Sequence, residues 1–141
     1  MFTDPEVAQV GITEEQAAEL VRGAGEAGGA RVAYLPMREV DRAVTAGRTG
    51  GFVKLIAGPR RLTGDLGGGR VLGATIVASR AGEMIGEVAL AMRTGMFAGR
   101  LAQTAHAYPS SSLAIQQAAA EFFGGYGGRT ARPARARDRQ P

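Results

Sequence analysis

Two apolar stretches that follow each other with no helix between them constrain the fold most strongly. Residues 52–57 and 71–78 both alternate in the way of strands, and the connecting residues 58–70 are rich in glycine and proline. Neighbouring strands joined by a loop pair antiparallel, so the pattern predicts a hairpin with a long tip. We expect one face of the pair to carry the apolar side chains of Val53, Leu55, Leu72, Ala74 and Ile76.

The remaining segments add strands and helices without regular alternation. Alternating apolar residues predict strands at 8–12 and 32–37, and Pro36 favours a sheet edge for the second strand. Thr13 and Gln16 have the spacing of a capping box, which predicts a helix that ends near Gly23. Helical periodicity or capping residues predict further helical segments at 41–46, 81–94, 98–104 and from Ser110 or Ser111 to Phe123. The sequence therefore predicts an α+β domain, an antiparallel sheet with helices on one face.

The positive charge is concentrated at the C-terminus. Residues 129–141 hold five arginines and one aspartate, which equals the net charge of +4, so residues 1–128 are neutral. Few apolar residues and many charges predict disorder. We therefore expect one domain over residues 1–125 and a disordered, Arg- and Pro-rich tail over residues 126–141. A neutral body argues against a nucleic-acid platform, although the tail leaves binding through arginines open as a weaker alternative.

Composition excludes several kinds of site within this chain. There is no cysteine, so disulfides, thiolate metal sites and a redox cysteine pair are excluded. His106 is the only histidine, so we expect no metal site. No segment approaches the roughly 20 apolar residues needed to cross a bilayer, and we expect a cytoplasmic protein that does not bind membranes.

Three strings in the sequence resemble one family. FTDPEVAQVGITEEQA stands at the start, FVKLIAGP followed by RVLGATIVASRAGEMIGEVALAMRTG in the middle, and LAQTAHAYPSSSLAIQQAA near the end. In this order they resemble the C-terminal dimerisation (interface) domain of the pyridine nucleotide-disulfide oxidoreductases, such as glutathione reductase, dihydrolipoamide dehydrogenase and mercuric reductase. The resemblance covers about residues 2–123.

The resemblance implies an oxidoreductase of which this chain is one part. The complete enzyme would carry FAD-binding and NAD(P)H-binding domains upstream, and FAD and NAD(P)H would be its cofactors. Two chains would form a homodimer through this domain, and the segment around Tyr108 and Pro109 would complete the active site of the partner. We expect the isolated chain to bind no cofactor and to be inactive. The alternative is a free-standing dimerisation or interaction module without catalytic activity.

The last string departs from the commoner pattern of the family at two positions. Most relatives have a histidine directly before the proline and a glutamate five residues after that histidine, whereas this chain has Tyr108 and Leu113. An unperturbed tyrosine has a pKa of about 10, so Tyr108 can donate a hydrogen bond at neutral pH but is a poor base. His106 corresponds to a histidine of many relatives that is not the catalytic one, and we expect it to bond to the backbone of its loop.

Other polar residues favour structural roles. The serines at 110–112 lack a nucleophile turn and a histidine partner, which favours helix capping. Glu83 and Glu87 lie one helical turn apart, and we expect them on a solvated or dimer-facing side. The glycine clusters at 64–69 and 124–128 do not open a helix after a strand, so a phosphate-binding loop is not expected at either.

Overall fold

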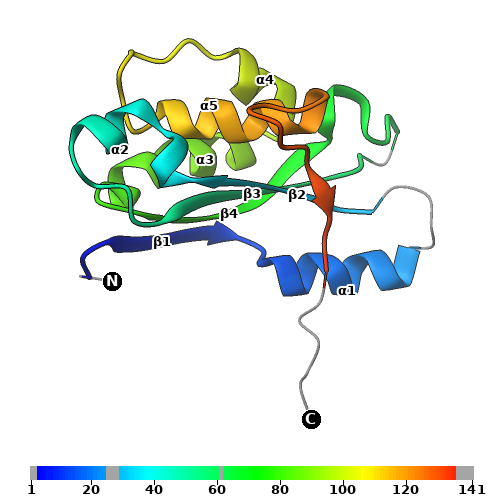
Figure 1. The fold of residues 1–141 in the computed structure, drawn as a ribbon. Coiled ribbons are helices and arrows are strands. Elements are labelled where there is room, and N and C mark those ends of the chain that lie inside the picture. Colours follow the sequence, from blue (N-terminus) through cyan, green and yellow to red (C-terminus); the bar gives the residue numbers. More distant parts are fainter. Residues whose placement is uncertain (1–2, 25–28, 61, 136–141) are drawn as a thin grey trace.

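The chain forms one five-stranded antiparallel sheet with its larger core on one face (Figure 1). The computed structural model describes residues 3–24, 29–60 and 62–135. The strands lie in the order β1-β4-β3-β2-β5. They are β1 (Glu6–Gly11), β2 (Arg31–Pro36), β3 (Phe52–Gly58), β4 (Arg70–Ala78) and β5 (Arg132–Pro133). The predicted hairpin is therefore confirmed as β3 and β4, which pair antiparallel.

Helices lie on both sides of this sheet. They are α1 (Glu14–Ala24), α2 (Asp41–Thr45), α3 (Ala81–Arg93), α4 (Ala98–Gln103) and α5 (Leu113–Ala120). Short 3-10 turns are η1 (Met37–Glu39), η2 (Leu66–Gly68) and η3 (Glu121–Phe123). Helices α2 to α5 lie above the sheet in Figure 1, and α1 lies below it. The predicted α+β class is confirmed, and α1 lies on the face opposite to the other described helices.

The capping box at the start of α1 forms as predicted. The backbone N–H of Thr13 donates to Oε1 of Gln16 at 2.9 Å, and the N–H of Gln16 donates to Oγ1 of Thr13 at 3.3 Å. These two bonds satisfy donors that the first turn of a helix leaves without partners. The local sequence therefore sets where α1 begins.

The main core lies between the sheet and two helices. Helix α3 packs on β1 and β4, α5 packs on β2 and β3, and α4 packs on α5. The largest fully buried apolar side chains of this core are Leu35, Met37, Leu55, Ile76, Met84, Leu101 and Ile115. Many of the smaller buried residues are alanines, which let the helices approach the sheet closely. A smaller cluster of Ala17, Ala30, Val32 and Ile56 lies on the opposite face, under α1.

The expectation that Leu72 shares a face with Ala74 and Ile76 is wrong. Leu72 packs against the smaller cluster under α1, while Ala74 and Ile76 belong to the main core. The register explains the difference, because Ile56 lies opposite Gly73 but the next residue, Ala57, lies opposite Val71. One extra residue in β4 reverses the alternation of its side chains.

Residues 126–135, which fall in the expected tail, make contacts with the rest of the domain. Residues of β5 pair with residues of β2. The N–H of Ala131 donates to the carbonyl oxygen of Glu121 at 2.9 Å, and the N–H of Ala134 donates to the carbonyl oxygen of Ala30 at 2.8 Å. Arg129 forms an ion pair with Glu39, and Arg132 forms one with Glu14. Acidic partners on distant elements thus hold a segment whose own composition suggests disorder. Residues 136–141 lie outside the described residues.

Candidate functional site

Tyr108 lies in the loop between α4 and α5, on the surface. Its side chain is 71% exposed, and its hydroxyl donates to Oδ2 of Asp41 at 2.7 Å. Asp41 is the first residue of α2. The loop therefore presents the tyrosine ring outward and bonds its phenol to a helix residue that lies 67 positions earlier in the chain. Neither residue's sequence context indicated this contact.

Asp41 raises the pKa of Tyr108. The hydrogen bond from the phenol to the carboxylate is the main cause, and the negative charge of Asp41 adds to it. An ionised Tyr108 would lose the bond and would face a like charge. The phenol therefore keeps its proton throughout the neutral range and can act as a hydrogen-bond donor or as an acid.

His106, two residues before Tyr108, holds the same loop against α3. Its side chain is only 7% exposed, with Nδ1 2.8 Å from the carbonyl oxygen of Thr104 and Nε2 2.8 Å from Oε1 of Glu87. The expected bond to the loop backbone is thus present, and the bond to Glu87 is additional. Both ring nitrogens therefore face oxygen atoms of the protein itself, which fixes the orientation of the ring.

The serines after Pro109 support the helix that follows. Oγ of Ser110 accepts a hydrogen bond from the backbone N–H of Leu113 at 3.3 Å, as expected for capping. Within the part of the chain that the structure describes, none of these hydroxyls bonds to His106. Leu113, at the position that holds a carboxylate in the commoner pattern, is the first residue of α5, and its side chain is apolar.

The glycine clusters do not form a cofactor-binding loop. Gly64 bonds to Arg60 within the hairpin tip, and Gly67 and Gly68 form η2, which leads into β4. Gly124 and Gly125 follow η3 and lead toward β5. Neither cluster opens a helix after a strand, the arrangement that a dinucleotide requires. The described residues also contain no group of three or more His, Cys, Asp or Glu side chains that could hold a metal ion.

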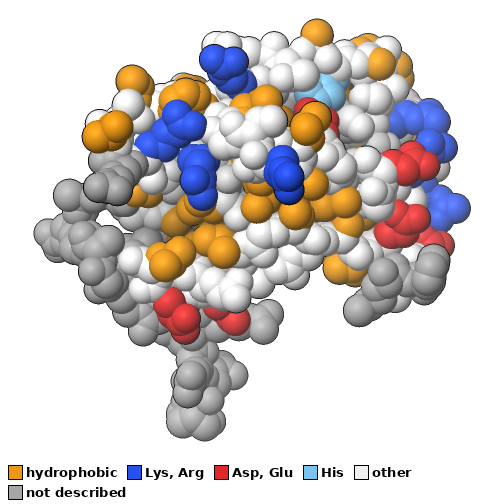
Figure 2. Space-filling view, turned by 180° about the vertical axis from the view of Figure 1, so that it is seen from behind, with side chains coloured by type: hydrophobic (Ala, Val, Ile, Leu, Met, Phe, Trp, Pro, Cys, Tyr) orange, Lys and Arg blue, Asp and Glu red, His pale blue; other side chains and the backbone are white. Residues whose placement is uncertain are grey.

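The outward side of α3 is a second candidate functional surface. Gly82, Gly86 and Leu90 recur at every fourth residue and are exposed, and Leu90 is 63% exposed. A side-chain carbon added at Gly86 would meet nothing within 4 Å. Figure 2 shows hydrophobic side chains in several groups on the face opposite to the view of Figure 1, with separate Lys and Arg side chains between them. The described Lys and Arg side chains on that face therefore form no continuous basic surface.

The two acidic residues of α3 have different surroundings. Glu87 is partly buried and binds His106, whereas Glu83 is exposed and lies 3.4 Å from Arg80. Glu83 therefore lies on a solvated side, as expected. No helix in the described part of the chain has the length and hydrophobicity to cross a bilayer.

Residues 1–119 match one family model, described as "Pyridine nucleotide-disulphide oxidoreductase, dimerisation domain". The dihydrolipoyl dehydrogenase of Haloferax volcanii is 37% identical over 124 residues, which are 88% of this chain and 23% of that protein. The mitochondrial dihydrolipoyl dehydrogenase of Sus scrofa is 39% identical over 118 residues, which are 84% of this chain and 21% of the other. The chain thus spans about a quarter of the length of these relatives.

Solved structures give the same fold. LpdA from Mycobacterium tuberculosis superposes with a TM-score of 0.65 at 36% identity, covering 84% of this chain and 23% of that one. The HOCl-induced flavoprotein disulfide reductase RclA from Escherichia coli, in its Cu(II) complex, superposes with a TM-score of 0.70 at 28% identity. That match covers 84% of this chain and 24% of the other.

Proposed function

Because the chain belongs to the dimerisation-domain family of the pyridine nucleotide-disulphide oxidoreductases, we propose that it pairs two subunits of a flavin-dependent oxidoreductase and completes the partner's active site. The observation that carries the proposal is the family match over residues 1–119, joined to a fold that solved disulfide reductases share. A cytoplasmic location goes with this proposal.

The cofactors of the whole enzyme would be FAD and NAD(P)H, held by domains upstream of this chain. Neither glycine cluster of this domain has the geometry of a dinucleotide loop, which supports a division of labour in which this chain supplies the interface. When bound, a flavin passes electrons between the nicotinamide and the substrate. The residues of this chain would orient the substrate and supply a proton.

The homodimer would form through the outward side of α3. Exposed Leu90 and the open surface at Gly86 provide an apolar contact that allows close approach of another helix. A two-fold axis places the same patch on both subunits, so such a surface needs to complement only itself.

Tyr108 would act in the active site of the partner as a proton donor. Its ring is exposed, while His106, buried two residues earlier, fixes the base of the loop. The phenol stays protonated near neutral pH, so it suits a hydrogen bond to an anionic group such as a thiolate. To make that bond, the phenol would give up its hydrogen bond to Asp41 and donate to the substrate instead. Tyr108 could not serve as the base that a histidine provides.

The arginines of the C-terminal segment give little support to nucleic-acid binding. Arg129 and Arg132 already pair with Glu39 and Glu14, so two of the five positive charges are neutralised within the fold. The contact with a phosphate backbone depends on free positive charge.

Flavin content tests the division of labour between the domains. The purified chain, refolded or incubated with excess FAD and then desalted, is expected to show no absorbance near 450 nm, because the proposed FAD site lies upstream. The longer enzyme prepared in the same way should retain one flavin per subunit. Stoichiometric flavin in the 141-residue chain would contradict the proposal.

A further inference from the structure

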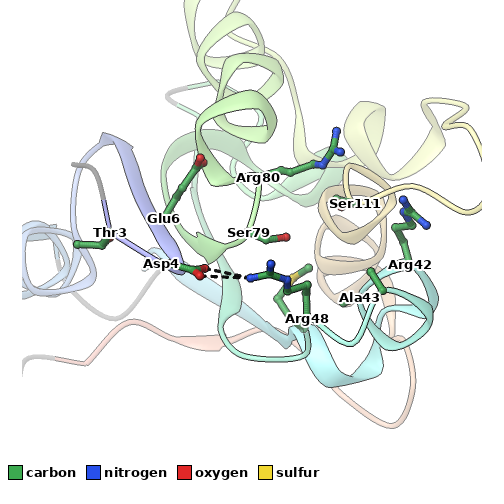
Figure 3. Close-up of a pocket in the computed structure, with 11 residues that line it drawn as sticks. Thr3, Asp4, Glu6, Arg42, Ala43, Arg48, Ser79, Arg80 and Ser111 are labelled. Atoms are coloured by element: carbon green, nitrogen blue, oxygen red, sulfur yellow. Dashed lines mark hydrogen bonds and ion pairs between the residues drawn. The ribbon is translucent and has the colours of Figure 1, made fainter.

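A polar pocket at the N-terminal end of β1 has hydrogen-bond donors left over. The cavity measures about 490 Å³, within the range of small-molecule sites. Three arginines from separate segments line it: Arg42 in α2, Arg48 before β3 and Arg80 before α3. Figure 3 shows Asp4 and Glu6 on one side of the pocket and Arg42 on the other, with Arg48, Ser79 and Arg80 between them.

The carboxylates of the pocket already have donors. Asp4 accepts from Arg48, with a closest distance of 3.2 Å, and Oε2 of Glu6 accepts from the backbone N–H of Gly82 at 2.9 Å. Each of the two carboxylates is therefore already engaged with a donor of the protein itself.

The hydrogen-bond donors that line the pocket are less fully engaged than these carboxylates. The guanidinium of Arg42 has no hydrogen-bond or ion-pair partner among the described residues, and neither has the hydroxyl of Ser79 or of Ser111. Arg48 and Arg80 are engaged only in exposed ion pairs, the second at 3.4 Å from Glu83. Such surface pairs contribute little and exchange readily for another anion. An arginine brings five N–H groups in a planar fork that matches carboxylate or phosphate oxygens.

From this inventory we infer that the pocket binds a small molecule carrying more than one oxyanion, such as a diphosphate or a polycarboxylate. Arg42 is the primary contact, the hydroxyls of Ser79 and Ser111 accompany it, and Arg48 and Arg80 complete the positive wall. The inference is independent of the role proposed for Tyr108.

Titration of the ¹⁵N-labelled chain followed by NMR tests the inference. Sodium diphosphate and sodium citrate are the two probes, and sodium chloride keeps the ionic strength constant. We expect saturable amide shifts around residues 42–48, 79–82 and 111 with at least one probe. Saturation by diphosphate alone identifies a phosphate ligand, by citrate alone a carboxylate ligand, and by both a general oxyanion site.

A matched pair of variants separates a site from general attraction to a basic protein. Arg42→Gln removes the unpaired guanidinium and is expected to weaken binding about tenfold or more, as for a lost charge-assisted hydrogen bond. Arg38→Gln removes the same charge from an exposed residue that does not line the pocket, and should change affinity less than about twofold. Equal weakening by both variants, or shifts that do not saturate with either probe, would overturn the inference.

Discussion

At the scale of single residues, the proposed chemistry depends on the hydroxyl of Tyr108. Tyr108 replaces the histidine that most relatives place before the proline, and the structure gives it Asp41 as a hydrogen-bond partner. A carboxylate partner makes a histidine a better base, but it makes a tyrosine a weaker acid. The same kind of neighbour therefore keeps the phenol protonated here, so that it donates a hydrogen bond but releases its proton less readily.

Tyr108→Phe in the longer enzyme is expected to slow the half-reaction with the oxidising substrate by about tenfold to a hundredfold, as for loss of one positioned proton donor. Reduction of the flavin by NAD(P)H should change little, because the proposed role of the phenol lies on the substrate side. Stopped-flow absorbance measures the two half-reactions separately. Tyr34→Phe is the control, since it also removes a partly exposed hydroxyl but lies on β2. An unchanged substrate half-reaction in Tyr108→Phe would reduce Tyr108 to a packing residue.

At the scale of elements, the C-terminal segment shows how contacts override composition. The carboxylate of Glu14, at the start of α1, forms ion pairs with Lys54 of β3 and with Arg132 of β5. Burial raises the pKa of Glu14, but the hydrogen bonds and charges of the two cations outweigh it and lower the pKa to about 2. One carboxylate therefore holds together the first helix, a central strand and the last strand.

The lowered pKa predicts how stability depends on pH. A carboxylate with a depressed pKa contributes stability above its unfolded value of 4.5 and loses that contribution as the pH falls toward about 2. Glu14→Gln is therefore expected to lower the free energy of unfolding by about 1–2 kcal/mol at pH 7, with allowance for solvent screening. The difference from the unaltered chain should shrink below pH 4.5 and vanish only below about pH 2. Urea denaturation at a series of pH values measures it.

Two further variants serve as comparisons for Glu14→Gln in that experiment. Deletion of residues 129–141 removes Arg132 and should reduce the effect of Glu14→Gln, because the two changes act on one ion-pair network. Glu19→Gln removes a charge from the exposed side of the same helix and should leave the pH dependence unaltered. A Glu14→Gln effect that is constant from pH 7 to pH 2 would exclude the ion-pair account.

Much of the fold could be predicted from local sequence, because capping, alternation and turn residues act over a few positions. The Thr13–Gln16 box and the β3–β4 hairpin are examples. The face of Leu72 could not be predicted, since one extra residue in the register changes it. Strand β5 was also unpredictable, because its stabilising partners lie about 100 residues away.

The candidate site was less accessible to sequence reasoning. The family pattern identified the Tyr108 position, but its partner Asp41 and the His106–Glu87 pair depend on tertiary packing. Glu121 gave no signal either, although it is only 2% exposed and accepts the backbone N–H of Tyr34 at 3.1 Å. Burial raises the pKa of Glu121, and the bond from Tyr34 opposes that effect. A charged residue near the end of a helix gives no sign in sequence that it will be buried.

At the scale of the whole molecule, the account rests on association of two copies. Helix α3 leaves Leu90 exposed between small residues while its other side packs on β1 and β4. The matched family is a dimerisation domain, and the proposal places its two-fold contact on this side of α3. Self-association through α3 is open to direct measurement.

Sedimentation equilibrium of the 141-residue chain at micromolar concentration tests the central claim most directly. We expect a mass of twice the 14.6 kDa of one chain. Leu90→Arg, which places charges of the same sign opposite each other across the two-fold axis, should give a monomer with an unchanged circular dichroism spectrum. Val44→Arg on α2, where the side chain is 53% exposed, should remain dimeric. A chain that is monomeric at all concentrations, or a Leu90→Arg variant that dimerises as well as the unaltered chain, would contradict dimerisation through α3.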